Sequence, residues 1–317
     1  MDKSIKNGII GFVVGDVLGV PVEFMAREEL RKNPVVDLRA YGTHNQPLGS
    51  WSDDTSMTLA TMDSIIHKEK IDTTDMGNRF LNWYKKSEYT PRGKVFDIGR
   101  TTIQALTKYE LKLDEAKNCG EDDEYSNGNG SLMRMIPIAY YIYYKKIKDD
   151  KEIYNIVKDV SSITHRHEVS ILGCYIYVSF ILGLLNGLEK KQVYNNTKKM
   201  NYNYFSKDSF KRYDRILKDD ITALNLDGYI VNTLECVLYM FLKSNDYNTA
   251  ILEGVNLGND TDTIGSCLGG LLGLYYGLNS IKESWRKNII KYDYIIDLCN
   301  KFESIILWKK HNIINTY

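Results

Sequence analysis

Residues 256–273 read NLGNDTDTIGSCLGGLLG, and two features of this stretch decide the predicted fold. It opens with acidic and hydroxyl-bearing residues of the kind that start helices. It continues with Gly265, Gly269 and Gly273, a spacing that extends to Gly277. Residues four apart lie on one face of a helix, so these glycines form a ridge without side chains. Each glycine costs about 1 kcal/mol of helix propensity, a loss that close packing against another helix offsets.

A second glycine series with the same four-residue spacing runs from Gly11 to Gly19, near the start of the chain. Two arrangements fit the two series. In one, the helices contact each other along their glycine faces, which brings Asp16, Glu23 and the region of Asp260 to one place. In the other, each glycine face packs against an unrelated helix.

The rest of the sequence also has helical periodicity, with apolar residues three and four positions apart. The predicted helices cover 4–19, 54–67, 73–86, 97–111, 130–144, 151–164, 168–188, 229–243, 247–257, 261–276 and 292–309. Only five prolines occur, no segment alternates long enough to predict a sheet, and no linker divides the chain. We therefore predict an all-α fold in a single domain, residues 1–317, with surface loops at 119–127 and 200–208.

Composition excludes several classes of protein. The 41 basic and 41 acidic side chains give a net charge of zero, so no field attracts nucleic acid in general or an anionic membrane. A hydrophobic content of 43% excludes wholesale disorder. Five scattered cysteines, with no recognisable signal peptide, favour a reducing, cytoplasmic location over a disulfide framework.

Two uncharged stretches, residues 169–188 and 263–281, approach the length of a membrane span. Glycine, serine and asparagine dilute both stretches, and no distinct basic cluster follows either of them. Fully buried helices of a globular protein have the same hydropathy. We interpret both as buried helices and predict no membrane association.

Two short acidic motifs stand at predicted helix starts: SDDT at 52–55 and NDTDT at 259–263. One interpretation is helix capping, because Ser, Asp and Thr are preferred N-cap residues. The other is metal binding, because a cap needs one acceptor whereas crowded carboxylates repel one another unless a cation joins them. Oxygen ligands alone favour Mg²⁺ or Mn²⁺ over zinc.

Seven segments, taken in order, resemble the ADP-ribosylglycohydrolase family. They are GFVVGDVLGVPVEF (11–24), GSWSDDTSMTLA (49–60), FDIGRTT (96–102), GNGSLMRMIP (128–137), THRHE (164–168), GYIVNTLECVL (228–238) and NLGNDTDTIGSCLGGLLG (256–273). The resemblance implies an orthogonal multi-helix bundle with a central metal-binding cleft that holds two Mg²⁺ or Mn²⁺ ions.

The resemblance also implies roles for individual residues. The metal ligands would be Glu23, Ser52, Asp53, Asp54, Asp260, Asp262 and Thr263. The substrate-binding residues would be Gly128, Asn129, Gly130, Ser131, Leu132, Met133, Arg134 and His165. Glu23 and Asp97 would be the catalytic residues that accept a proton from the attacking water.

Four of these residues have simpler structural interpretations. Glu23 could instead cap a helix or pair with Arg27. Asp97 could be the N-cap of the helix that follows it. Arg134 could be a structural ion-pair partner, and His165 a hydrogen-bonded histidine of the core.

The implied function is a metal-dependent hydrolase that cleaves the glycosidic bond at C1″ of ADP-ribose. Its substrate would be an ADP-ribosylated protein or a small ADP-ribosyl compound, its product ADP-ribose, and acceptor choice would depend on loops 33–47 and 119–127. Two alternatives stay open. One is an inactive ADP-ribose-binding or structural homologue, and the other is a two-metal nucleotide or sugar phosphohydrolase.

Overall fold

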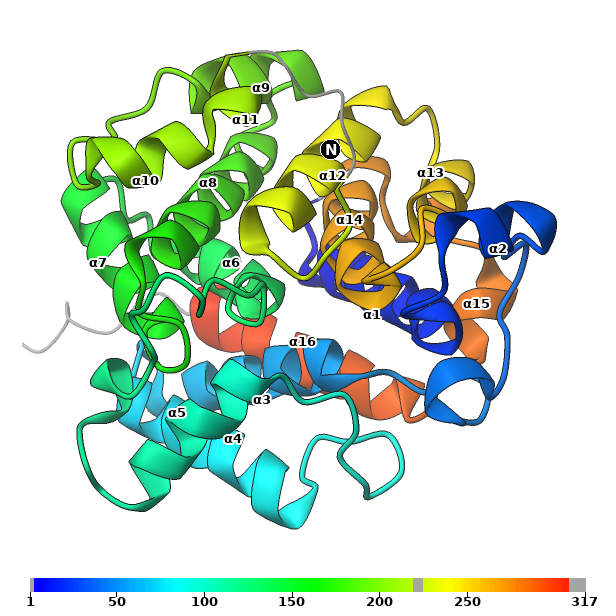
Figure 1. Cartoon of the computed structure of the whole chain (residues 1–317), viewed down its shortest axis with the longest axis horizontal. Coiled ribbons are helices and arrows are strands. Elements are labelled where there is room, and N and C mark those ends of the chain that lie inside the picture. Colours follow the sequence, from blue (N-terminus) through cyan, green and yellow to red (C-terminus); the bar gives the residue numbers. More distant parts are fainter. Residues whose placement is uncertain (1–2, 219–224, 308–317) are drawn as a thin grey trace, which may run out of the picture.

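The computed structural model describes residues 3–218 and 225–307, and its architecture is helical throughout (Figure 1). The helices are α1 (Ile5–Gly19), α2 (Arg27–Lys32), α3 (Asp53–Lys68), α4 (Thr73–Lys86), α5 (Arg100–Glu110), α6 (Ile136–Tyr144), α7 (Asp150–Ser161), α8 (Glu168–Leu185), α9 (Lys190–Thr197), α10 (Lys207–Arg212), α11 (Asp214–Leu217), α12 (Ile230–Lys243), α13 (Tyr247–Val255), α14 (Thr261–Tyr276), α15 (Glu283–Lys287) and α16 (Tyr292–Leu307). Within the described ranges, β-pairing is limited to three isolated bridges. The all-α prediction is confirmed.

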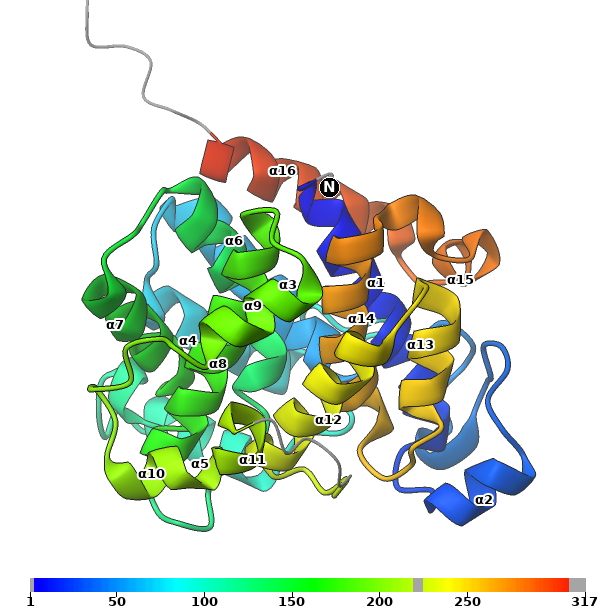
Figure 2. The same cartoon turned by 90° about the horizontal axis from the view of Figure 1, so that it is seen from above.

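Helices α1 and α14 lie side by side and antiparallel, and their glycine faces contact each other (Figures 1 and 2). A Cβ added to Gly15 would lie 1.9 Å from the carbonyl oxygen of Gly265. A Cβ added to Gly269 would lie 2.2 Å from the carbonyl oxygen of Gly11. Real Cβ atoms do not approach backbone this closely, so the two helices can pack at this distance only as glycine ridges. This contact, called the glycine contact below, confirms the first of the two predicted arrangements.

The antiparallel direction places the end of α1 beside the start of α14. The Thr261 hydroxyl donates a hydrogen bond of 2.8 Å to the carbonyl oxygen of Gly19. Past a 3-10 turn at Val20–Val22, Phe24 N–H donates to the Asn259 carbonyl oxygen over 2.7 Å. The segment that carries Glu23 is therefore tied directly to the acidic motif of α14.

Among the residues that the structure describes, two helical stretches are long and apolar enough to cross a bilayer, Ile5–Val22 and Glu168–Leu185. Of their residues, 94% and 78% respectively are buried inside the molecule. Helix α14, which occupies most of the second predicted apolar stretch, is buried from Thr261 to Leu274. These three helices thus pack in the interior of the bundle, as the interpretation of buried helices requires.

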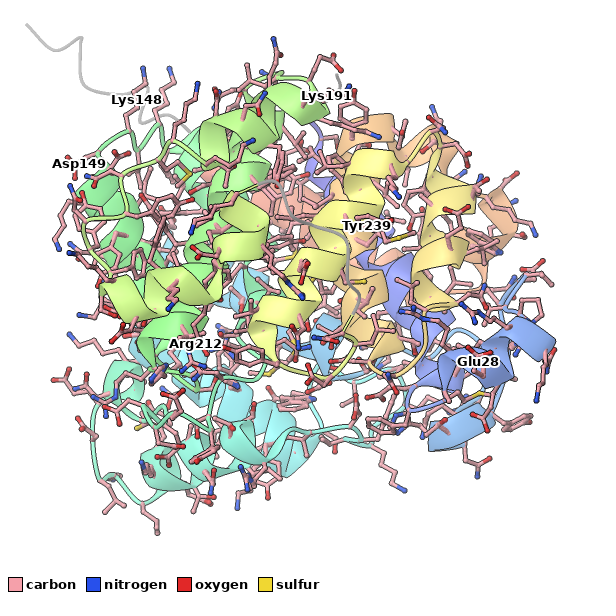
Figure 3. All side chains as sticks on the ribbon, turned by 45° about the horizontal axis from the view of Figure 1, so that its top comes forward. Glu28, Lys148, Asp149, Lys191, Arg212 and Tyr239 are labelled. Carbon is pink, nitrogen blue, oxygen red and sulfur yellow. The ribbon has the colours of Figure 1, made fainter. Side chains whose placement is uncertain are left out.

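Charged side chains of both signs lie on the outside. Figure 3 shows Glu28, Lys148, Asp149 and Lys191 at the edge of the molecule, and all four are exposed. This distribution agrees with the absence of a single-sign field in the composition.

Several predicted boundaries are wrong. The helix predicted over 97–111 begins at Arg100, because Asp97 has a backbone φ of 54°, outside the helical region. The helix predicted over 130–144 is a 3-10 turn at Leu132–Arg134 followed by α6, in whose first turn Pro137 lies. The last two residues of the helix predicted over 292–309 lie outside the described ranges. The short helices α2, α9, α10, α11 and α15 were not predicted, because few turns leave little periodicity.

Candidate metal centre and substrate cleft

Helix α3 begins within the SDDT motif. Ser52 is its N-cap, and the Ser52 hydroxyl accepts a hydrogen bond of 3.2 Å from Asp54 N–H. Asp53 and Asp54 occupy the first turn, and both side chains are buried. Capping therefore uses the serine alone and leaves both carboxylates for another role.

Helix α14 begins within the NDTDT motif, and Asp260 precedes it without forming a side-chain cap. The Asp260 carboxylate instead accepts a hydrogen bond of 2.6 Å from the Asn129 amide. In Asp262, Oδ1 accepts from Thr263 N–H, while Oδ2 is buried and has no hydrogen-bond partner. Capping does not explain this motif either.

The two helix starts meet. Asp54 accepts hydrogen bonds from the Ser266 hydroxyl over 2.6 Å and from the Thr263 hydroxyl over 3.3 Å, both on α14. Carboxylate oxygens of Glu23, Asp260 and Asp262 lie within 4.8 Å of one another. Two stretches about 200 residues apart in sequence thus form one acidic site.

Asp16 supports this site. It was predicted to lie near Glu23 and the region of Asp260, but its role as a hydrogen-bond acceptor for the start of α3 was not predicted. Its carboxylate accepts hydrogen bonds from the backbone N–H of Ser52, over 3.0 Å, and of Thr55, over 3.1 Å. The Thr55 hydroxyl adds a third bond of 2.6 Å. Burial raises the pKa of Asp16 to about 6. A lone carboxylate on an otherwise apolar, glycine-lined helix is the sequence feature that could have identified it.

The carboxylate cluster, defined as Glu23, Asp53, Asp54, Asp97, Asp260 and Asp262, is short of positive charge. Burial, followed by the negative charges of its neighbours, raises the pKa of Glu23 to about 11. Burial is also the first cause that raises the pKa of Asp53 and Asp262 well above the usual range. Among the described residues, the ion pairs of this cluster are those with His44. A buried surplus of carboxylate oxygens with one orphaned atom is the donor set that fits hard divalent cations.

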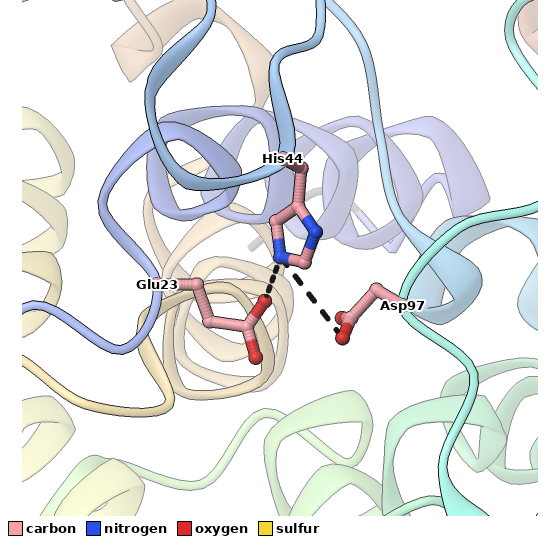
Figure 4. A group of neighbouring side chains, drawn as sticks. All are labelled: Glu23, His44 and Asp97. Carbon is pink, nitrogen blue, oxygen red and sulfur yellow. Dashed lines mark hydrogen bonds and ion pairs between the residues drawn. The ribbon is translucent and has the colours of Figure 1, made fainter.

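Figure 4 shows His44 with its ring directed toward Glu23 and Asp97, two members of the carboxylate cluster. The imidazole Nε2 is hydrogen-bonded to Glu23 and lies 4.0 Å from Asp97 Oδ1. Arg27 Nε donates to the Leu257 carbonyl oxygen, and Gly99 precedes α5 at the N-cap. The N-cap interpretation of Asp97 is therefore wrong, and the carboxyl group of Glu23 has His44 as its hydrogen-bond partner.

A cleft of about 340 Å³ is lined by every member of the carboxylate cluster except Asp262. The same cleft is lined by Gly128, Asn129, Gly130, Met133 and His165, which were predicted to bind substrate, and by Arg100, Thr102 and Tyr125, which were not. Tyr125 belongs to the predicted 119–127 loop and is 87% exposed. The structure thus joins the acidic site and the glycine-containing loop in a single cavity.

The other three predicted substrate residues, Ser131, Leu132 and Arg134, are buried and do not line the cleft. Arg134 donates hydrogen bonds of 3.0 Å to the carbonyl oxygens of Gly130 and Val160. It forms no ion pair with any carboxylate in the described ranges, so the ion-pair interpretation is wrong. Its contacts hold the loop in place from beneath.

His165 packs against the loop. A Cβ added to Gly130 would lie 2.9 Å from its ring carbon Cε1, so the glycine permits this approach. Its Nδ1 is hydrogen-bonded to the Thr164 hydroxyl over 2.8 Å. Burial, with a smaller effect of the Arg134 charge, lowers the pKa of His165 to about 3. The ring is therefore neutral at physiological pH.

Comparisons with known proteins identify the family of the chain. A family model described as ADP-ribosylglycohydrolase matches residues 2–311. An ADP-ribosylarginine hydrolase, Tri1, of Serratia proteamaculans is 28% identical, over 95% of this chain and 79% of its own. The ADP-ribosyl-(dinitrogen reductase) glycohydrolase of Rhodospirillum rubrum is 26% identical, over 88% of this chain and 87% of its own.

A solved structure titled ADP-ribosylglycohydrolase-related protein complex has the same fold, with a TM-score of 0.80. It is 24% identical and covers 95% of this chain and 96% of its own. The resemblance drawn from the seven segments is confirmed by the family model, which spans nearly the whole sequence. The chain belongs to the ADP-ribosylglycohydrolase family.

Proposed function

We propose that this protein is a metal-dependent hydrolase that cleaves the glycosidic bond at C1″ of ADP-ribose attached to an acceptor, and releases ADP-ribose. One observation carries the proposal. The two acidic helix starts and Glu23 meet in the same cleft that the 128–130 loop lines. A cation site can bind ribose hydroxyls, and a glycine-containing loop can bind phosphate groups. Together in one cavity, they suit a substrate that carries both ribose hydroxyls and a pyrophosphate.

The cations would be two Mg²⁺ or Mn²⁺ ions. The proposed ligands are Glu23, Ser52, Asp53, Asp54, Asp260, Asp262 and Thr263. The buried surplus of negative charge and the orphaned Oδ2 of Asp262 support them. When bound, such ions supply positive charge that orients ribose hydroxyls and makes water more acidic.

The loop would hold the ADP-ribose. Gly128 and Gly130 let the backbone approach a ligand closely, as phosphate-binding loops require. The Asn129 amide donates to Asp260 and to the Thr233 hydroxyl over 3.0 Å, so the same residue ties the loop to the carboxylate cluster. Neutral His165 forms the floor of this part of the cleft.

Glu23 and Asp97 are the candidate proton acceptors in this proposal. Both line the cleft, and Asp97 is the more accessible, with 21% of its side chain exposed. The backbone of Asp97 has a φ of 54°, which keeps this residue out of helix α5 and directs its carboxylate toward the other members of the cluster. A base in this position would take the proton that water releases as it attacks C1″.

For the acceptor we propose arginine. The part of the cleft lined by Glu23 and Asp97 is acidic, and a guanidinium group complements paired carboxylates. The similarity to proteins named ADP-ribosylarginine hydrolase, from Serratia proteamaculans and Pseudomonas putida, supports the same choice.

A panel of acceptors tests the proposal. ADP-ribosyl-arginine, ADP-ribosyl-serine, O-acetyl-ADP-ribose and ADP-ribosylated nucleic acid would each be incubated with the protein after EDTA treatment, with and without Mg²⁺ or Mn²⁺. We expect intact ADP-ribose from the arginine compound in the presence of metal, and none without it. Nucleoside monophosphate or free phosphate as the product would favour the phosphohydrolase alternative. Binding of ADP-ribose without turnover of any compound would favour the inactive homologue.

A further inference from the structure

His44 occupies a position that the surrounding loop fixes. Gly42, at φ +61°, packs directly on the turn before Glu23, since an added Cβ would lie 1.8 Å from the Pro21 carbonyl oxygen. The Thr43 hydroxyl donates a hydrogen bond of 2.6 Å to the carbonyl oxygen of Glu23. The loop that carries His44 is therefore bonded to the same backbone segment that carries Glu23.

The imidazole ring is held between two aromatic side chains. Its centroid lies 5.9 Å from that of Phe24 and 5.2 Å from that of Phe96, and 13% of the side chain is exposed. The ring presents Nε2 to the carboxylates of Glu23 and Asp97 (Figure 4). Such a placement is preorganised, because the ring has little freedom to turn elsewhere.

The spacing of these groups suits a shared cation. Ligand atoms of Glu23, His44 and Asp97 all lie within 4.8 Å of one another. Two atoms bound to one ion at about 2.1 Å each are at most about 4.2 Å apart, which His44 Nε2 and Asp97 Oδ1 satisfy at 4.0 Å. His44 and Glu23, now in direct hydrogen-bond contact, would separate slightly to admit the ion.

Glu23 also belongs to the all-oxygen group with Asp260 and Asp262. One buried oxygen of Asp262 has no hydrogen-bond partner, which independently supports this residue as a cation ligand. Glu23 thus lies between two possible cation positions, one formed by oxygens alone and one that contains an imidazole nitrogen.

We propose that His44 Nε2 is a metal ligand in the second position, and that this ligand makes the centre select a first-row transition ion such as Mn²⁺ over Mg²⁺. The inference rests on the proposed function and deepens it, because it names the ion that the site prefers. Imidazole is a poor ligand for Mg²⁺, which takes oxygen donors, and binds the transition ions more strongly. The ion takes the place of the hydrogen bond between His44 Nε2 and Glu23.

Electron paramagnetic resonance of Mn²⁺ tests the ligand directly. Metal-free protein would be titrated with Mn²⁺, and pulsed spectra would be recorded for the wild type, His44→Gln and His67→Gln. His67 lies at the end of α3 with 59% of its side chain exposed, so it is the matched control. We expect coupling to an imidazole ¹⁴N nucleus in the wild type and in His67→Gln, and its loss in His44→Gln.

Competition between Mn²⁺ and Mg²⁺ tests the selectivity. We expect His44→Gln to lower the Mn²⁺/Mg²⁺ affinity ratio at least about tenfold, in the range seen when a metal site loses a supporting group. Circular dichroism would check that the variant folds. If it does not fold, the presence or absence of ¹⁴N coupling in the pulsed spectrum of the wild type decides whether His44 is a ligand.

Two results would overturn the inference: bound Mn²⁺ without ¹⁴N coupling in the wild type, or coupling that persists in folded His44→Gln. In either case, Mg²⁺-dependent release of ADP-ribose by the wild type would leave the proposed function intact. Absence of both Mn²⁺ binding and ADP-ribose release would count against the two proposals together.

Discussion

The glycine contact and the carboxylate cluster lie end to end, yet their energetics are opposite. In the glycine contact, α1 and α14 pack backbone against backbone, and the Tyr247 hydroxyl donates to the Gly11 carbonyl oxygen over 2.7 Å. In the carboxylate cluster, burial, followed by the charges of the neighbouring acids, raises the pKa of Asp262, and one of its oxygens has no hydrogen-bond partner. The difference indicates that a well-packed interface holds an unfavourable group of charges in place. Stability and function should therefore respond to different substitutions.

The largest effect is expected from Gly15→Ala. The added methyl would lie 1.9 Å from a carbonyl oxygen of α14, and backbone cannot rotate away as a side chain can. We expect the free energy of unfolding to fall by about 3 kcal/mol, the upper end for an overpacked core. Urea denaturation measures it.

Gly254→Ala is the matched control for this substitution. Gly254 is also a helical glycine facing α14, but its added methyl would meet the Leu268 side-chain tip, which can move. We expect a loss below about 1 kcal/mol. Equal losses in the two variants would show that the glycine contact is not the more sensitive interface.

The next effect concerns turnover. Asp53→Ala and Asp262→Ala should each lower the rate of ADP-ribose release at least about 100-fold, as removal of a preorganised charge does. In EDTA, the same variants should be no less stable than the wild type, because each loses a repelling carboxylate. Thermal unfolding and steady-state kinetics check both points. Unchanged activity in both folded variants would remove the proposed centre.

The smallest effect is a dependence on pH. Folded Glu23 keeps its proton up to a pKa of about 11, whereas an unfolded glutamate loses it near pH 4. Because the folded state then binds more protons, the free energy of unfolding in EDTA should fall as pH rises from 7 to 8. The expected slope is about 1.4 kcal/mol per pH unit for each retained proton. His165 does not oppose it in this window, since its lowered pKa affects stability only below about 6.5.

Urea denaturation at pH 7.0, 7.5 and 8.0 measures this slope. Saturating Mn²⁺ should flatten it, since a cation replaces the protons, and Asp53→Asn should reduce it. If the free energy of unfolding in EDTA instead rises with pH, groups other than a metal ion already neutralise the negative charge of the cluster.

The helices could be predicted because they depend on local patterns. The glycine spacing left two arrangements of α1 and α14 open, and the structure has the one in which they contact each other. The convergence of the two acidic motifs was implied by the family resemblance, and the structure brings Asp54 to Thr263 and Ser266. Capping and metal binding were both open for the SDDT motif, and the structure assigns the cap to Ser52. The predicted roles of these residues as ligands stay predictions.

His44 could not be predicted, because its position depends on a loop that has no periodicity. The loop is held by Gly42 on Pro21 and by Thr43 on Glu23, contacts between segments about 20 residues apart. Asp97 was assigned two roles for a related reason. Its left-handed backbone angle, which separates it from α5, has no marker in the sequence beyond the glycine two residues later.

The pairing of α1 with α14 has a consequence for synthesis of the protein. Thr261 and Gly19, which are hydrogen-bonded, are separated by 242 positions along the chain. During translation, α1 lacks this partner until most of the polypeptide has been made, although earlier helices such as α3 can already contact it. Part of its apolar surface therefore stays exposed during elongation, a situation in which chaperones act. Assembly of the cleft is among the last events in its folding, because long loops must close first.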